Sequence, residues 1–70
     1  MNRKVISAQM HESTFLAGVG EIKKTVDSKA FPQVEIRLTE LGVSFTLAQG
    51  MVILPLVNFK AILVGPEGNE

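Results

Sequence analysis

Apolar and polar residues alternate most regularly in the middle of the chain, in residues 34–39 and again in residues 43–47. A period of two predicts half-buried β-strands. If these strands form a hairpin, their apolar faces coincide when Leu38 lies opposite Val43. The loop between them is then 39–42, and its last residue is a glycine, which adopts the left-handed conformation that such a position often needs.

A second glycine-containing turn, at 48–50, follows directly. A three-residue loop that ends in glycine suits a hairpin with a bulge, and it sets Leu47 opposite Met51. In this register the apolar side chains of Val52 and Leu54 lie on the outer face of the sheet, beside polar side chains of the preceding strand.

The last apolar run, residues 57–64, follows Pro55, which cannot donate a ladder hydrogen bond and marks a strand end, an edge or a bulge. We interpret the run as a strand with its odd-numbered residues on the inner face; a short helix directly after Pro55 is the alternative. Exposed apolar patches usually mark interfaces. We therefore expect a homo-oligomer, a dimer or a tetramer, whose interface consists of the outward apolar residues Val52, Leu54, Ile62 and Val64.

The N-terminal half is less regular. Residues 4–10 fit a strand with Ile6, Ala8 and Met10 on one side. Residues 14–26 carry apolar residues at the spacing of a helix, but they also contain two glycines, each of which disfavours a helix by about 1 kcal/mol. We favour a bent strand there, with one short helix as the alternative. The chain as a whole predicts a mainly β fold, a small antiparallel sheet with hairpins at 39–42 and 48–50.

Length and composition add the expectation of self-association. Seventy residues form one domain at most, 1–70, and bury a limited fraction of their surface. Small domains usually add disulfides, a metal or a partner subunit. With no Cys and a single His, the chain leaves oligomerisation as the open route. Since no secretory leader or membrane-spanning run is visible, we expect a cytoplasmic protein without a membrane partner.

Two short motifs contain residue types of catalytic or nucleotide sites. Gly18 and Gly20 lack the third glycine, or the Lys-Ser/Thr pair, of phosphate-binding loops, and we interpret them as a backbone bend. His11, Glu12 and Ser13 are sequential neighbours, whereas a nucleophile, base and orienting group converge from separate parts of a fold. We therefore expect neither an enzyme nor a cofactor or metal site.

Basic residues are unevenly distributed although the formal net charge is zero: up to Lys29 there are five basic and three acidic residues. Proteins that bind single strands combine a basic groove with aromatic rings on which bases stack. We expect phosphate contacts from Lys23, Lys24, Lys29 and Arg37, and base stacking on Phe31. The alternative is that the lysines are solvated surface charges and the phenylalanines belong to the core.

Two motifs in the second half resemble small β proteins encoded by bacteriophages. A Thr-Glu-Leu-Gly-Val turn at 39–43 is followed by a Leu-Pro-x-x-Asn-hydrophobic-Lys segment at 54–60, and the resemblance extends over residues 39–64. Some of these phage proteins, such as those of the Drc type, bind single-stranded DNA and assist early transcription. The resemblance implies an oligomeric accessory protein of replication or transcription in the host cell cytoplasm, and it transfers no binding residue.

A second function fits the apolar outer face. It is a protein-interaction module or inhibitor that docks on a host or viral enzyme, such as a polymerase, through Val52, Leu54 and Ile62. The two hypotheses differ in their response to salt, because only phosphate contacts weaken steeply with ionic strength. The C-terminal segment 65–70 holds two Glu and no basic residue, and we expect it to be a flexible acidic tail.

Overall fold

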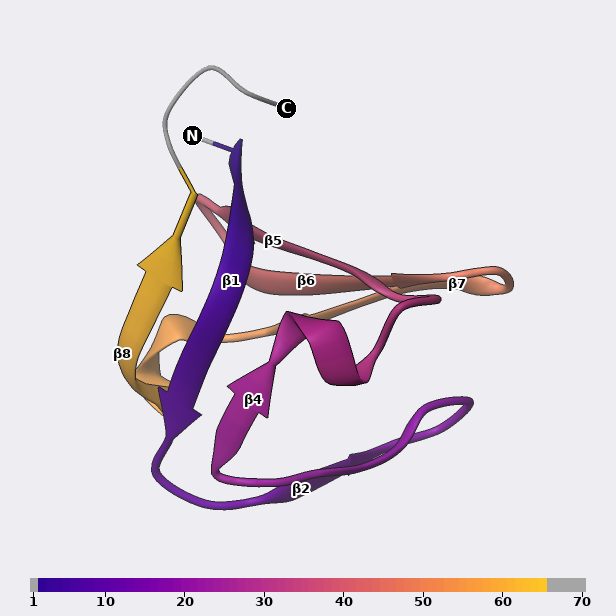
Figure 1. Cartoon of the computed structure of the whole chain (residues 1–70), viewed down its shortest axis with the longest axis horizontal. Coiled ribbons are helices and arrows are strands. Elements are labelled where there is room, and N and C mark those ends of the chain that lie inside the picture. Colours follow the sequence, from indigo (N-terminus) through magenta and orange to yellow (C-terminus); the bar gives the residue numbers. More distant parts are fainter. Residues whose placement is uncertain (1, 66–70) are drawn as a thin grey trace.

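Short antiparallel strands make up most of the computed structural model, which describes residues 2–65 (Figure 1). The strands are β1 (Asn2–Met10), β2 (Thr14–Leu16), β3 (Gly20–Ile22), β4 (Thr25–Asp27), β5 (Glu35–Thr39), β6 (Gly42–Leu47), β7 (Gly50–Leu54) and β8 (Phe59–Val64). Two 3-10 helices, η1 (Ser28–Ala30) and η2 (Leu56–Asn58), lie in the connections. The predicted mainly β, antiparallel fold is confirmed.

Strand β1 is shared by two sheets. Its first residues pair with β5, and the ladder continues through β6 to β7; we call β1-β5-β6-β7 the first sheet. Its second half pairs with both β4 and β8, so these two strands lie on opposite edges of β1 and form the second sheet (Figure 1). The register against β8 shifts between Val5 and Ser7. Such a bulge bends a strand and lets it pass from one sheet into the other.

The hydrophobic core lies where the two sheets and the β2–β3 hairpin meet. Its buried members are Val5, Ala8, Met10, Leu16, Ile22, Val26, Ile36, Val43, Phe45 and Phe59. Leu16 and Ile22 come from the hairpin, which is a separate two-stranded sheet. Because these two side chains are buried in the common core, the hairpin is held against the rest of the fold by apolar packing.

The first hairpin forms as predicted. Leu38 pairs with Val43, which is the predicted register, and Thr39 also pairs with Gly42. Only Glu40 and Leu41 remain at the tip. The hydroxyl of Thr39 donates to the Gly42 carbonyl oxygen at 2.9 Å and accepts from the Leu41 N–H at 3.2 Å, so the turn is closed by its own side chain.

The second hairpin forms at the predicted turn but in a different register. Leu47 pairs with Gly50 instead of Met51, so the loop has two residues and not three. Because side chains alternate with a period of two, this shift of one residue turns the whole of β7 over. Val52 lies opposite Phe45 on the inner face, and Met51 lies on the outer face, 59% exposed.

Strand β8 faces the opposite way from the prediction after its first residue. Phe59 is buried, but the register against β1 shifts by one residue directly after it. Ile62 and Val64 therefore pack against the core, whereas Leu63 is 58% exposed. Both interpretations of the segment after Pro55 hold in part, since the short helix η2 precedes the strand.

The four residues expected to form an oligomer interface thus do not face outward. Val52, Leu54, Ile62 and Val64 are half-buried and pack against the core, which corrects their predicted orientation. The large apolar side chains that are exposed are instead Ile6, Phe15, Leu41, Met51, Leu56, Val57 and Leu63.

The N-terminal half contains one further difference. Ile6 does not share a face with Ala8 and Met10, because the β1 bulge leaves it 42% exposed and buries Val5. Residues 14–26 form strands β2, β3 and the start of β4, so the helix alternative is wrong. The segment is extended as predicted, but it is not one bent strand, because β2 and β3 pair with each other as a hairpin.

The predicted tail 65–70 falls almost wholly outside the described residues. Gly65, its described member, donates its N–H to the Lys4 carbonyl oxygen at 2.8 Å and accepts from Arg3 Nη2 at 3.0 Å. Between residues 2 and 65 there is no helix of the length and apolarity needed to cross a membrane.

Candidate nucleic-acid interface

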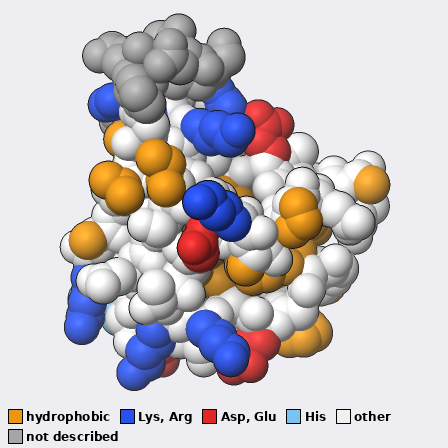
Figure 2. All heavy atoms as spheres, viewed as in Figure 1, with side chains coloured by type: hydrophobic (Ala, Val, Ile, Leu, Met, Phe, Trp, Pro, Cys, Tyr) orange, Lys and Arg blue, Asp and Glu red, His pale blue; other side chains and the backbone are white. Residues whose placement is uncertain are grey.

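Strand β4 and helix η1 position three of the predicted basic residues. Lys23 and Lys24 lie in the connection from β3 to β4, Lys29 lies in η1, and all three are exposed. Because β4 pairs with β1, the three lysines before and after β4 are spread along one side of β1. Figure 2 shows Lys and Arg side chains at intervals down this face, with a few acidic and apolar side chains between them.

The turn at η1 is stabilised by its own cap. The Asp27 side chain accepts a hydrogen bond from the Lys29 N–H at 3.0 Å, which satisfies one of the free donors at the start of the helix. This cap fixes the Lys29 backbone, and the Asp27 carboxylate that makes it is engaged with a backbone donor.

Arg37 does not join these lysines. It lies on the outer face of the first sheet, where its Nη1 forms an ion pair with Glu35 at 2.9 Å and its Nε donates to the side-chain oxygen of Asn2. Its side chain is 17% exposed. The guanidinium is therefore committed to neighbours in the same sheet and has little surface left for a phosphate.

Phe31 follows η1 and is half-buried against the core, so one part of the ring is structural. It also lines a surface hollow of about 410 Å³ between β1 and η1, which we call the β1–η1 groove. Lys4 and Lys29 line the same groove, as does Glu35, whose carboxylate accepts from Arg37. Two lysines and an aromatic ring thus converge from β1, η1 and the residue after η1.

Lys4 was missed by sequence reasoning because it is separated from Lys29 by 25 positions and only the β1–β5 and β1–β4 pairings bring the two segments together. The signal that could have found it was its place near the start of β1, where it directly follows Arg3 and so forms a basic pair with it.

Phe15 was also left out of the prediction, yet it is the exposed aromatic residue of the hairpin, with 72% of its surface accessible. It lies in β2 opposite Glu21, and Lys23 follows directly after the end of β3. The hairpin therefore carries an exposed aromatic ring on one strand and an exposed lysine just after the other.

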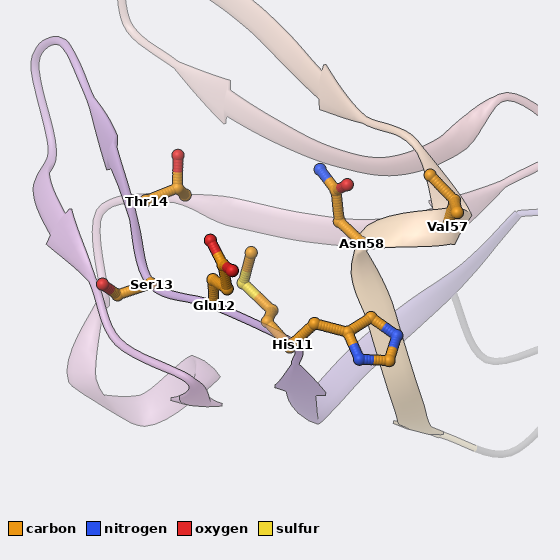
Figure 3. Close-up of a pocket in the computed structure, with 7 residues that line it drawn as sticks. His11, Glu12, Ser13, Thr14, Val57 and Asn58 are labelled. Carbon is orange, nitrogen blue, oxygen red and sulfur yellow. The ribbon is translucent and has the colours of Figure 1, made fainter.

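The corner between β1 and β2 holds the chain's histidine, which lines a surface hollow together with Glu12, Ser13 and Asn58. The backbone N–H of His11 donates to the backbone carbonyl oxygen of Asn58 at 3.0 Å, which fixes the corner to η2. Figure 3 shows the His11 ring pointing away from Glu12 and Ser13. Within the described part of the chain, no group of three or more potential metal ligands comes together.

Comparison with known proteins gives no relative from which a function could be transferred: no family model, no curated protein and no solved structure matches this chain. The class of the protein is therefore defined by the fold alone, as a small antiparallel β protein with one strand shared by two sheets.

Proposed function

We propose that this protein is a non-enzymatic binder of single-stranded nucleic acid, and that the β1–η1 groove is its central contact. The observation that carries the proposal is the convergence of Lys4, Lys29 and Phe31 in one hollow. Lysines supply phosphate contacts that do not depend on sequence, and an aromatic ring stacks on any base.

The other lysines extend the path of the strand. Lys24 precedes β4 and Lys29 follows it, so a backbone that runs along β4 meets a positive charge at either end. Lys23 and the exposed ring of Phe15 continue this path onto the hairpin. Arg37 is left out of the proposed contacts, because Glu35 and Asn2 already bind it.

A single strand fits this arrangement better than a duplex. Stacking on Phe31 or Phe15 requires an unpaired base whose face is free. No described α-helix is available to enter a major groove, which is the usual element for reading duplex DNA. The phage accessory role in replication or transcription, in the host cell cytoplasm, belongs to this proposal and is supported by the motifs at 39–43 and 54–60.

The test is fluorescence-polarisation binding to a labelled single-stranded oligonucleotide and to its duplex, at low and moderate salt. We expect preference for the single strand and affinity that falls steeply with salt. The double variant Lys4→Glu/Lys29→Glu should weaken binding at low salt by about tenfold or more and lower the salt slope by about one per lysine.

Lys60→Glu is the matched control, since Lys60 is an exposed lysine on β8, on the opposite edge of β1 from β4. It makes the same charge change as the single variant Lys29→Glu, but away from the groove, and should weaken binding less than Lys29→Glu does. The proposal is wrong if micromolar protein at low salt binds no oligonucleotide, or if Lys60→Glu weakens binding as much as a groove substitution does.

The alternative, docking on another protein through Val52, Leu54 and Ile62, loses its structural argument because these residues face the core. What still supports a protein partner is the number of other exposed apolar side chains, such as Leu56 and Val57 on η2. Partner binding that salt does not weaken, with no oligonucleotide bound, would favour this second function.

A further inference from the structure

Strands at the ends of the two sheets differ in how well their free edges are protected. An end strand exposes unpaired N–H and C=O groups, which can template pairing with another chain. Among the described residues, β4 and β8 end the second sheet and β7 ends the first. Natural sheets blunt such edges with short strands, charged residues, proline or bulges.

Both edges of the second sheet carry such devices. Strand β4 has three residues, includes Asp27, and turns directly into η1. Strand β8 contains Lys60 and has an irregular register against β1 on either side of its regular pairs. A lysine and a bulge are two of the features that hinder edge-to-edge pairing.

Strand β7 has none of them. Its five residues Gly50–Leu54 contain no charge and no proline, and they pair with β6 in five consecutive positions without a shift. Its outward residues Met51 and Ile53 are apolar, and Met51 is 59% exposed. A regular, uncharged, apolar edge is a surface that pairs readily with another strand.

We propose that β7 pairs antiparallel with β7 of a second copy of this chain, so that the first sheets of two copies join into one. An antiparallel pair of identical strands is self-complementary about a two-fold axis, which is the symmetry of most dimers. Because Gly50–Leu54 bears no charge and the chain has a formal net charge of zero, two copies approach without like-charge repulsion at this edge.

Joining the sheets also shields apolar surface on their outer faces. When all of Gly50–Leu54 pairs about the two-fold axis, Val52 lies opposite Val52 of the other copy, and Met51 of each copy lies opposite Ile53 of the other on one outer face. Leu41 is 75% exposed at the tip of the first hairpin, and it lines a shallow hollow on the outer face of the first sheet together with Met51 and Ile53. This assignment replaces Val52, Leu54, Ile62 and Val64 as the dimer contact, and it does not depend on nucleic-acid binding.

The test is sedimentation velocity of the full chain over a wide concentration range. The wild-type protein should form a dimer. Met51→Lys should raise its dissociation constant at least about tenfold, because each lysine would lie against the apolar Ile53 of the other copy, with the two like charges as diagonal neighbours. Val57→Lys is the matched control, because Val57 is 78% exposed on η2 and outside the pairing strand. It should leave the dimer intact.

Hydrogen exchange of the backbone amides provides a second measurement that needs no variant. The amides of Gly50–Leu54 should exchange more slowly in concentrated than in dilute protein, while those of β8 should not change. A wild-type protein that stays monomeric at about 0.1 mM would overturn the proposal. So would a dimer that Val57→Lys disrupts and Met51→Lys does not, since its contact would then lie at η2.

Discussion

Gly42 is a residue that no other amino acid can replace without strain. It opens β6 with a φ of 143°, in the range that L-residues rarely adopt, and it is enclosed by the end of β7. A Cβ atom at this position would overlap the Leu54 carbonyl oxygen, which is a backbone atom and cannot rotate away. The turn therefore depends on glycine for its backbone angle and also for space.

The prediction at this scale is that Gly42→Ala lowers the free energy of unfolding by about 2–4 kcal/mol, because strain and overlap add. Gly20→Ala is the control: Gly20 also has a positive φ, 111°, but no atom lies within 4 Å of the point that its Cβ would occupy. It should cost about 1–2 kcal/mol. Urea unfolding followed by circular dichroism measures the free energy of unfolding of both variants. If both lost the same amount, the Cβ atom at position 42 would not overlap the Leu54 carbonyl oxygen, and the prediction would be wrong.

Individual strands in this fold turn over when their register shifts by one residue. In β8 the extra residue after Phe59 exchanges the inner and outer faces, so that Ile62 packs on the core and Leu63 is exposed. Both side chains are apolar and adjacent, and their different burial follows from the bulge alone. The register of this one element thus decides which of two similar residues stabilises the protein.

The prediction for β8 is a large difference between two neighbouring charge substitutions. Ile62→Asp places an unpaired carboxylate against the core and should destabilise by about 3 kcal/mol or more. Leu63→Asp stays in solvent and should change stability by less than about 1 kcal/mol. Chemical denaturation of both variants is the measurement, and the reverse order would place the odd-numbered residues on the inner face.

The whole molecule is held together by β1, which pairs with strands of both sheets, and by one core. Val26 of the second sheet and Val43 of the first are both buried in that core. A core built from both sheets makes independent unfolding of either sheet unfavourable, since each would leave apolar surface of the other exposed.

We therefore predict a single unfolding transition that includes both sheets. Val26→Ala and Val43→Ala should each lower the free energy of unfolding by about 2 kcal/mol and shift the amide signals of both sheets to the same lower urea midpoint in NMR spectra. If Val26→Ala moved the midpoint of the second sheet alone, the two sheets would be separate cooperative units.

Local sequence patterns predicted the parts of the fold that depend on near neighbours. The alternation around Leu38 and Val43, with the glycine between them, gave the correct register of the first hairpin, because both strands carry a clear apolar face and only one pairing aligns them. The segment after Gly50 has apolar residues at every position up to Leu54, so either face fits the core by pattern alone.

The candidate site was predictable to a smaller extent. Lys29 and Phe31 lie two residues apart, and their proximity in the β1–η1 groove follows from the chain itself. Lys4 joins them through strand pairing. Arg37 is withdrawn by Glu35, two residues before it on β5, and by Asn2, which the β1–β5 pairing sets opposite Thr39 and diagonal to Arg37. Residues that are distant in the chain and meet only through strand pairing show no pattern in the local sequence that would predict their contact.

The class of fold, the positions of the two hairpin turns and the absence of disulfide chemistry follow from the order of residues, because alternation, glycine and the lack of Cys are local properties. The bulges in β1 and β8, the register of β7 and its free edge depend on packing between distant strands. Strand side chains repeat every two residues, so a shift of one residue leaves the local pattern nearly unchanged but inverts which side chains the core buries.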